Sequence, residues 1–171
     1  QRIAIFTDKV IQKTGLLDTV LANITKEAVE LTILNDLPPE PTYGQVEVLA
    51  EQCKSFKADF IIAVGGGSVM DSAKLASMLM TDAYRIKDLF SEPLKGKKFI
   101  KTVMIPTTIG TGAEATPNAI VAVPEQQLKV GIVNPHMIAD YVILDPIMVK
   151  NLPRSLAAAT GVDALSHAIE C

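Results

Sequence analysis

A run of apolar residues leads directly into the three glycines Gly65–Gly67, after which helix-forming residues resume, in the segment DFIIAVGGGSVMDSAK. The β-branched and other apolar residues before the glycines predict a buried strand over 60–64. The residues after them predict a helix from Ser68 to about Met80, with Ser68 as its N-cap and Asp71 as the acid of a capping box. Consecutive glycines cost conformational entropy unless something approaches the backbone closely. The segment therefore predicts a strand, a tight turn and a helix that together face a ligand.

Apolar runs of the same kind recur along the chain and alternate with helix-periodic stretches. Strands that are separated by helices and are apolar on both faces form parallel sheets, so the pattern predicts an α/β fold, a Rossmann-like parallel sheet with helices on both faces. Two β-rich runs around 124–127 predict a hairpin in addition. The expected strands of the sheet are 2–7, 29–34, 60–64, 102–108 and 141–146, and the expected helices ahead of the glycines are 9–24, interrupted by Gly15, and one that carries Val46, Leu49, Ala50 and Cys53 and ends near Ala58.

The composition of the chain changes near Asn151, where an alanine-rich sequence typical of a helix begins. We therefore expect one α/β domain over residues 1–150 and the start of a helical domain over 151–171. The chain begins at Gln1 inside an apolar run and ends without a helix-stop signal, which indicates a piece of a longer protein.

Composition argues against several classes of partner. A net charge of -3 and a pI near 5.4 argue against nucleic acid. No apolar run approaches the roughly 18 residues that a membrane span needs. The two cysteines, Cys53 and Cys171, have no C-x-x-C spacing, and the start of the chain has no signal-peptide pattern. We expect reduced thiols in a cytoplasmic protein that binds neither nucleic acid nor membranes.

Two loops rich in glycine and hydroxyl groups follow neighbouring predicted strands. The start of the helix after the glycines offers free N–H groups to an anion, although the pattern is neither G-x-G-x-x-G nor a P-loop. The second loop, PTTIGTGAEAT, carries Thr107, Thr108 and Thr111. Loops at the carboxyl ends of neighbouring parallel strands line the crevice where open α/β sheets bind ligands. The pair favours a nucleotide, and two ordinary turns are the alternative.

Asp8 stands at the end of the first predicted strand. From that position a carboxylate can accept hydrogen bonds from both ribose hydroxyls of an adenosine and would repel a 2′-phosphate, which favours NAD over NADP. The alternative role of Asp8 is the N-cap of the helix that begins at Lys9.

Asp163 and His167 lie four residues apart in GVDALSHAIE, so a helix places them on one face. A carboxylate oxygen and an imidazole nitrogen at this spacing suit one divalent metal ion. A local hydrogen bond between the two side chains is the alternative. Catalytic metal sites use three or more protein ligands as a rule, so further ligands would have to come from beyond Cys171.

Taken together, these motifs resemble the iron-containing, group III metal-dependent alcohol dehydrogenase family. The similarity runs from FTDK through GGGSVMD, PTTIGTGAE and LKVGIVNP to LPRSLAAATGVDALSHAIE, which is nearly the whole chain. It implies that residues 1–150 are a dinucleotide-binding α/β domain without its first segment. It also implies that residues 151–171 are the start of an all-helical metal-binding domain.

The resemblance implies roles for single residues. Asp163 and His167 match the first two metal ligands, for Fe²⁺ or alternatively Zn²⁺, and no other catalytic residue is expected in this segment. Glu40 stands where the family often has asparagine, which leaves open whether the proline-rich loop contacts the cofactor. The residues implied to bind NAD, with NADP less favoured, are Asp8, Gly66, Gly67, Ser68, Asp71, Thr107, Thr108, Thr111 and Lys129.

The implied activity is hydride transfer between NAD and a small primary alcohol or aldehyde, in a homo-oligomer that is a dimer or larger. Two other functions stay open. A sugar-phosphate lyase of the dehydroquinate synthase type shares a related fold and would show basic residues around the metal cleft. A nucleotide-binding fragment without catalytic activity is the second alternative.

Overall fold

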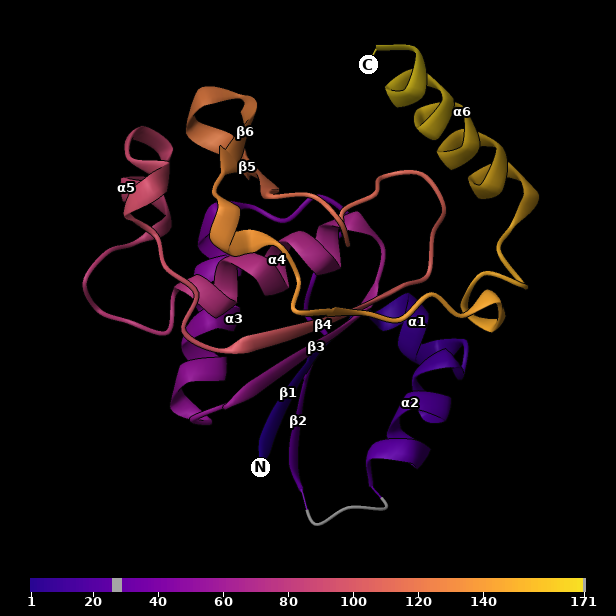
Figure 1. Cartoon of the computed structure of the whole chain (residues 1–171), viewed down its shortest axis with the longest axis horizontal. Helices are drawn as coiled ribbons and strands as arrows, with labels where there is room; N and C mark the ends of the chain where they lie inside the picture. Colours follow the sequence, from indigo (N-terminus) through magenta and orange to yellow (C-terminus); the bar gives the residue numbers. More distant parts are fainter. Residues whose placement is uncertain (26–28, 171) are drawn as a thin grey trace.

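A parallel five-stranded sheet in the order β2-β1-β3-β4-β7 forms the centre of the computed structural model (Figure 1). The structure describes residues 1–25 and 29–170, so Cys171 lies outside the described residues. The predicted α/β fold is confirmed. The strands of the sheet are β1 (Arg2–Phe6), β2 (Glu30–Leu34), β3 (Phe60–Gly65), β4 (Lys101–Pro106) and β7 (Tyr141–Val142), and each neighbouring pair is parallel.

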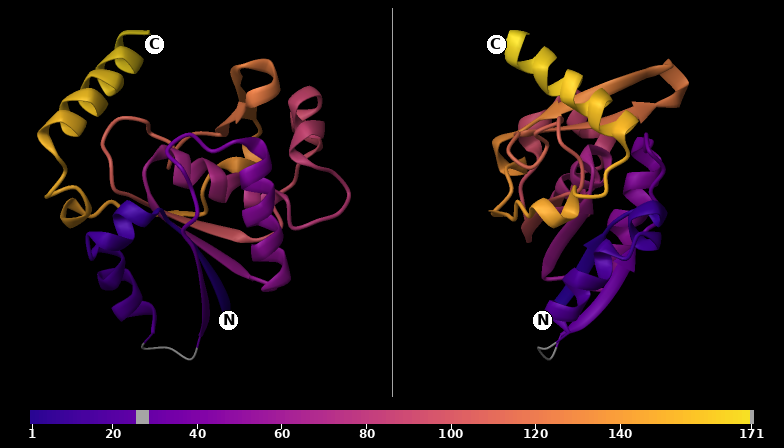
Figure 2. Two further views of the ribbon diagram at one scale, coloured as in Figure 1. Left: turned by 180° about the vertical axis from the view of Figure 1, so that it is seen from behind. Right: turned by 90° about the vertical axis from the view of Figure 1, so that its right-hand side faces the viewer.

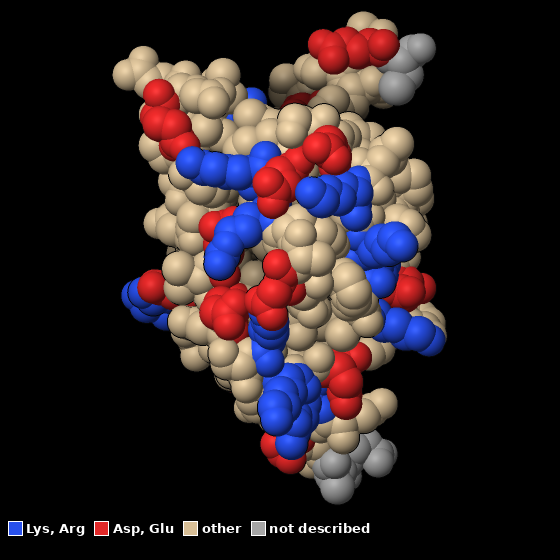
Figure 3. All heavy atoms as spheres, turned by 90° about the vertical axis from the view of Figure 1, so that its left-hand side faces the viewer, with Lys and Arg blue, Asp and Glu red and all other residues tan. Residues whose placement is uncertain are grey.

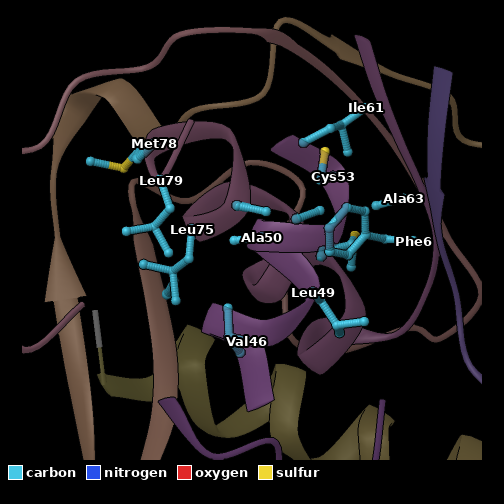
Figure 4. Packing of buried hydrophobic residues seen from close by; sticks show 14 of the residues in the cluster. Phe6, Val46, Leu49, Ala50, Cys53, Ile61, Ala63, Leu75, Met78 and Leu79 are labelled. Atoms are coloured by element: carbon cyan, nitrogen blue, oxygen red, sulfur yellow. The ribbon is translucent and has the colours of Figure 1, made fainter. Parts of the chain in front are cut away.

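Helices cover both faces of this sheet (Figure 1). Successive strand residues point to opposite faces, so Phe6 and Ala63 pack with α3 and α4, while Ile5 and Val64 pack with α2. Figure 4 shows the first of these two cores, with Phe6 against the buried face of α3. The α-helices are α1 (Lys9–Lys13), α2 (Leu16–Ile24), α3 (Tyr43–Ser55), α4 (Gly67–Met78), α5 (Ile86–Ser91) and α6 (Arg154–Glu170), and the 3-10 turns are η1 (Pro93–Lys95), η2 (Pro124–Gln126), η3 (Pro135–Met137) and η4 (Pro146–Met148).

A separate antiparallel hairpin, β5 (Asn118–Val123) and β6 (Leu128–Val133), turns at the position predicted from the sequence. Both views in Figure 2 place the hairpin and α6 at the end of the molecule toward which the parallel strands run. Within the described residues, no helix is both long and apolar enough to cross a bilayer. On the face drawn in Figure 3, basic and acidic side chains are interspersed and do not gather by sign.

The last strand of the sheet differs from the prediction. A buried strand was expected over 141–146, but β7 pairs with β4 through Tyr141 and Val142, which are 53% and 41% exposed. β7 lies at the edge of the sheet, and no described helix covers it in the way that α3 and α4 cover the central strands. Apolar composition therefore predicted a strand here correctly but overestimated its length and its burial.

Cys53 lies in the core on the buried face of α3 with no exposed surface. Burial raises the pKa of the Cys53 thiol from its ordinary value of 9.0 to about 12. Between these two values the unfolded chain loses a proton that the folded chain keeps, so stability falls as pH rises through this range. We expect wild type to lose about 2 kcal/mol more unfolding free energy than Cys53→Ala between about pH 8 and about pH 10.5, because each pKa unit corresponds to about 1.4 kcal/mol. Urea unfolding at both pH values checks this, and equal losses in the two proteins would contradict it.

Candidate functional site

Helix α4 begins directly after β3, at the predicted glycine turn, but its cap differs from the prediction. The N-cap is Gly66 in an extended conformation, the helix starts at Gly67, and no side chain caps it. The expected roles of Ser68 as N-cap and Asp71 as capping-box acid are therefore wrong. The Ser68 hydroxyl donates instead to the carbonyl of Pro39, and Asp71 is held by a neighbouring lysine. The first turn of α4 therefore keeps N–H groups that no side chain satisfies, which suits an anion.

The threonine loop follows β4 and lies against the glycine loop, as expected for loops after neighbouring strands. The N–H of Thr107 donates to the carbonyl of Gly65 over 3.0 Å. A Cβ at Gly66 would lie 3.3 Å from Thr108 Oγ1, and a Cβ at Gly67 would lie 3.1 Å from Thr111 Cγ2. The absence of side chains on these glycines is what lets the two loops approach so closely.

Thr107 is 2% exposed, and its hydroxyl has no hydrogen-bond partner among the described residues. Buried polar groups are normally paired, so an orphaned hydroxyl calls for an explanation. Thr107 lines a cavity of about 620 Å³ together with Gly66, Gly67 and Asp8. A polar ligand in this cavity would supply the missing partner.

Asp8 also lines this cavity and caps α1. Its Oδ1 accepts hydrogen bonds from the N–H groups of Val10 and Ile11, each over 2.8 Å. The alternative role drawn from the sequence, the N-cap of the helix at Lys9, is thus confirmed. Both bonds go to one oxygen, so the cap does not use Oδ2. Capping and ribose recognition are therefore compatible in the same carboxylate.

A second cavity of about 830 Å³ adjoins the first. Four residues line both cavities, so the two spaces meet at the start of α4. The larger space is bordered by Lys129 of β6 and by Asp163 and His167 of α6. The shared residues are Pro39, Gly67, Ser68 and Thr111.

Helix α6 reaches the site through a close contact with the threonine loop. A Cβ at Gly110 would lie 2.3 Å from the carbonyl oxygen of Thr160, so a side chain could not be accommodated there without moving the helix. One face of α6 lines the larger cavity, through Asp163, Ala164 and His167. Gly110 is not among the site residues predicted from the sequence, although its position within the threonine loop was a signal for it.

Asp71 and Lys74 form a buried ion pair beneath the larger cavity, with Lys74 Nζ 3.2 Å from Asp71 Oδ1. The ammonium also donates to Thr116 Oγ1 over 3.2 Å and to the carbonyl of Asn118 over 2.9 Å. The second oxygen of Asp71 accepts from the N–H of Ile120 over 3.0 Å. Burial raises the pKa of Asp71 and lowers that of Lys74, while each charge opposes the shift of the other. The pair thus ties α4 to β5, a role that the sequence analysis did not assign to Lys74.

Lys129 and Glu40 form an ion pair at the rim of the larger cavity, with Nζ 2.7 Å from Oε1. Lys129 was expected to contact the cofactor, and Glu40 was noted as a departure from the family pattern. In the structure these two residues contact each other at the rim of the larger cavity.

Asp163 Oδ1 and His167 Nε2 are 3.8 Å apart on one face of α6. This separation is too long for a hydrogen bond, so the alternative of a local Asp–His hydrogen bond is not realised. One carboxylate oxygen and one imidazole nitrogen at this spacing fit two positions of a divalent ion such as Fe²⁺ or Zn²⁺. In residues 1–25 and 29–170 no group of three or more His, Cys, Asp or Glu side chains could hold a metal. An ion bound here would need ligands from elsewhere.

The fold agrees with comparisons to known proteins. The family model described as iron-containing alcohol dehydrogenase matches residues 1–146, so the chain belongs to this family. Long-chain-alcohol dehydrogenase 1 of Geobacillus thermodenitrificans is 34% identical over 99% of this chain and 43% of its own length. Sulfoacetaldehyde reductase of Bilophila wadsworthia is 35% identical over 97% of this chain and 43% of its own length.

Solved structures show the same architecture. NADH-dependent butanol dehydrogenase A of Thermotoga maritima superposes with a TM-score of 0.91 at 27% identity, over 99% of this chain and 43% of that one. Sulfoacetaldehyde reductase of Bifidobacterium kashiwanohense, solved in complex with NAD⁺, superposes with a TM-score of 0.88 at 31% identity, over 99% and 45%. The chain thus spans less than half the length of these relatives.

Proposed function

We propose that this chain is the cofactor-binding part of an NAD-dependent, metal-dependent alcohol dehydrogenase or aldehyde reductase that acts on a small primary alcohol or aldehyde. The observation that carries the proposal is the meeting of two cavities at the start of α4, where the glycines, an uncapped helix start and the orphaned hydroxyl of Thr107 lie together. Two adjoining spaces joined at an anion-binding helix start suit a dinucleotide, whose two halves flank a pyrophosphate. The NAD⁺ complex of a similar enzyme supports the choice of cofactor.

In this proposal, different groups of residues contact different parts of the cofactor. Gly66, Gly67 and Ser68 bind the pyrophosphate, and Asp8 binds the adenosine ribose. The threonine side chains line the cleft between these two points, and Lys129 contacts the cofactor from the larger cavity. Asp71 acts indirectly, by holding β5 against α4. The threonines concerned are Thr107, Thr108 and Thr111.

Asp163 and His167 would hold the divalent metal together with ligands outside the described residues. A metal held by Asp163 and His167 would supply Lewis-acid chemistry at the substrate oxygen, and NAD held at the start of α4 would supply hydride-transfer chemistry. We place residues 1–150 in the dinucleotide-binding domain and residues 151–171 at the start of a helical metal-binding domain. The complete enzyme is proposed to be cytoplasmic and homo-oligomeric.

One observation favours a dehydrogenase over a sugar-phosphate lyase. Among the described residues that line the larger cavity, Lys129 is the single lysine or arginine, and it is already paired with Glu40. A substrate that carries both phosphate and carboxylate calls for several basic groups. A neutral alcohol or aldehyde does not.

Titration of the purified chain with NADH and NADPH, followed by cofactor fluorescence, tests the proposal. We expect NADH to bind at least about tenfold more tightly than NADPH, because the Asp8 carboxylate repels a 2′-phosphate. Asp8→Asn keeps a good N-cap for α1 but removes the charge, so it should lower this preference to about threefold or less. Asp163→Ala, in the proposed metal site, should leave the affinity for NADH unchanged. Absence of NADH binding by the wild-type chain would overturn the proposal.

A further inference from the structure

The segment Pro39–Pro41 is fixed from both sides at the rim of the larger cavity. The carbonyl of Pro39 accepts the hydroxyl hydrogen of Ser68, and the carbonyl of Pro41 accepts the N–H of Ala122 over 3.0 Å. Glu40 stands between these two anchored residues, so its backbone has a defined place between the start of α4 and the hairpin. The proline on each side restricts that backbone further.

The hairpin brings Lys129 to the same place. Ala122 and Lys129 are directly opposite each other in the β5–β6 register. The bond from Ala122 to Pro41 therefore also sets Lys129 beside the proline-rich segment. The resulting 2.7 Å contact between Lys129 Nζ and Glu40 Oε1 joins residues 89 positions apart in the chain. The ion pair is a product of the fold and not of neighbouring sequence.

Both charges remain partly exposed, Lys129 at 54% and Glu40 at 68%, and both line the larger cavity. An exposed pair of this kind shifts an equilibrium by a factor of about 2 to 5, so it holds the lysine without locking it. The Lys129 ammonium is therefore paired with Glu40 in this structure, but a ligand with a stronger negative charge can displace Glu40 from it.

We infer that Glu40 competes with the phosphates of the dinucleotide for Lys129 and thereby weakens cofactor binding. This rests on the proposed function, because it assumes that a dinucleotide occupies the joined cavities. Two electrostatic costs follow from this competition. A phosphate that binds the Lys129 ammonium must first displace the Glu40 carboxylate, and the displaced carboxylate then lies near the negative charge of the phosphate. Glu40 is thus an affinity-setting residue that acts through Lys129.

Fluorescence titration with NADH tests this inference. Glu40→Gln keeps the size of the side chain and removes its charge, so the dissociation constant should fall by about 3- to 10-fold, which combines loss of the competing pair with loss of repulsion. The matched control is Glu125→Gln at the turn of the same hairpin, which breaks an exposed pair with Lys87 away from both cavities. This control should leave the dissociation constant unchanged.

A double-mutant cycle separates competition from simple repulsion. In a Lys129→Met background there is no ammonium to compete for, so Glu40→Gln should change the dissociation constant by less than about twofold. An equal or larger effect in that background would overturn the competition. An unchanged dissociation constant in Glu40→Gln, with wild type still binding NADH, would overturn this inference and leave the proposed function standing. No binding by wild type would overturn both.

Discussion

Replacing Lys74 with methionine is expected to lower the free energy of unfolding by about 3–5 kcal/mol, because it leaves the buried carboxylate of Asp71 without its cation. The Lys74 side chain has no exposed surface, and the Asp71 side chain is only 12% exposed, so water can replace the lost partner only in part. The change also removes the donor to Thr116 and to the carbonyl of Asn118. Urea unfolding monitored by circular dichroism measures the loss.

Two further variants show whether the loss comes from the unpaired charge. Lys9→Met breaks an exposed ion pair with Asp36, in which the Lys9 side chain is 65% exposed and the Asp36 side chain 81%. This change should cost far less stability than Lys74→Met does. The double variant Asp71→Asn with Lys74→Met removes both charges, and the asparagine oxygen can still accept from Ile120. It should recover about half of the stability that Lys74→Met loses. If Lys74→Met were no more harmful than Lys9→Met, the account of the buried pair would be wrong.

The sheet and its two loops could be predicted because their signals are local. Apolar residues on both faces of 60–64 identify a central strand wherever it occurs, and the glycines mark the turn after it. The buried positions of α3, Val46, Leu49, Ala50 and Cys53, likewise follow from helical periodicity and are confirmed. In each case the residues that carry the signal are neighbours in the chain.

The features that could not be predicted depend on distant partners. Ser68 fits an N-cap pattern, yet its hydroxyl finds the carbonyl of Pro39, 29 positions earlier. A lysine in a helix normally faces solvent, but Lys74 is buried because Thr116 and Asn118 receive its hydrogen bonds from 42 and 44 positions away. The ion pair of Glu40 with Lys129 could not be predicted for the same reason, because 89 positions separate the two residues. A single sequence contains these side chains but not their distances from one another.

The second large effect is expected at the junction of the two cavities. Gly67→Val should weaken NADH binding at least about 100-fold, because loss of a close backbone approach to an anion removes several hydrogen bonds at once. A Cβ at Gly67 would already lie 3.1–3.3 Å from three atoms of Thr111. The two methyl groups of valine would have to displace the threonine loop or extend into the space that Gly67 borders in both cavities. NADH fluorescence titration measures the change.

Gly44→Val is the matched control, because Gly44 also lies in the first turn of a helix and a Cβ there would meet nothing within 4 Å. Both substitutions replace a glycine in the first turn of a helix by the same β-branched residue, so they should change intrinsic helix stability by a similar small amount, a gain of about a few tenths of a kcal/mol. Gly67→Ala adds the Cβ alone, which asks Thr111 to move by a few tenths of an ångström, and should weaken binding about 3- to 10-fold. A loss of NADH affinity that grows from Gly67→Ala to Gly67→Val would show that the cofactor needs the space at the start of α4. Retained affinity in a folded Gly67→Val would show that the cofactor phosphates bind elsewhere.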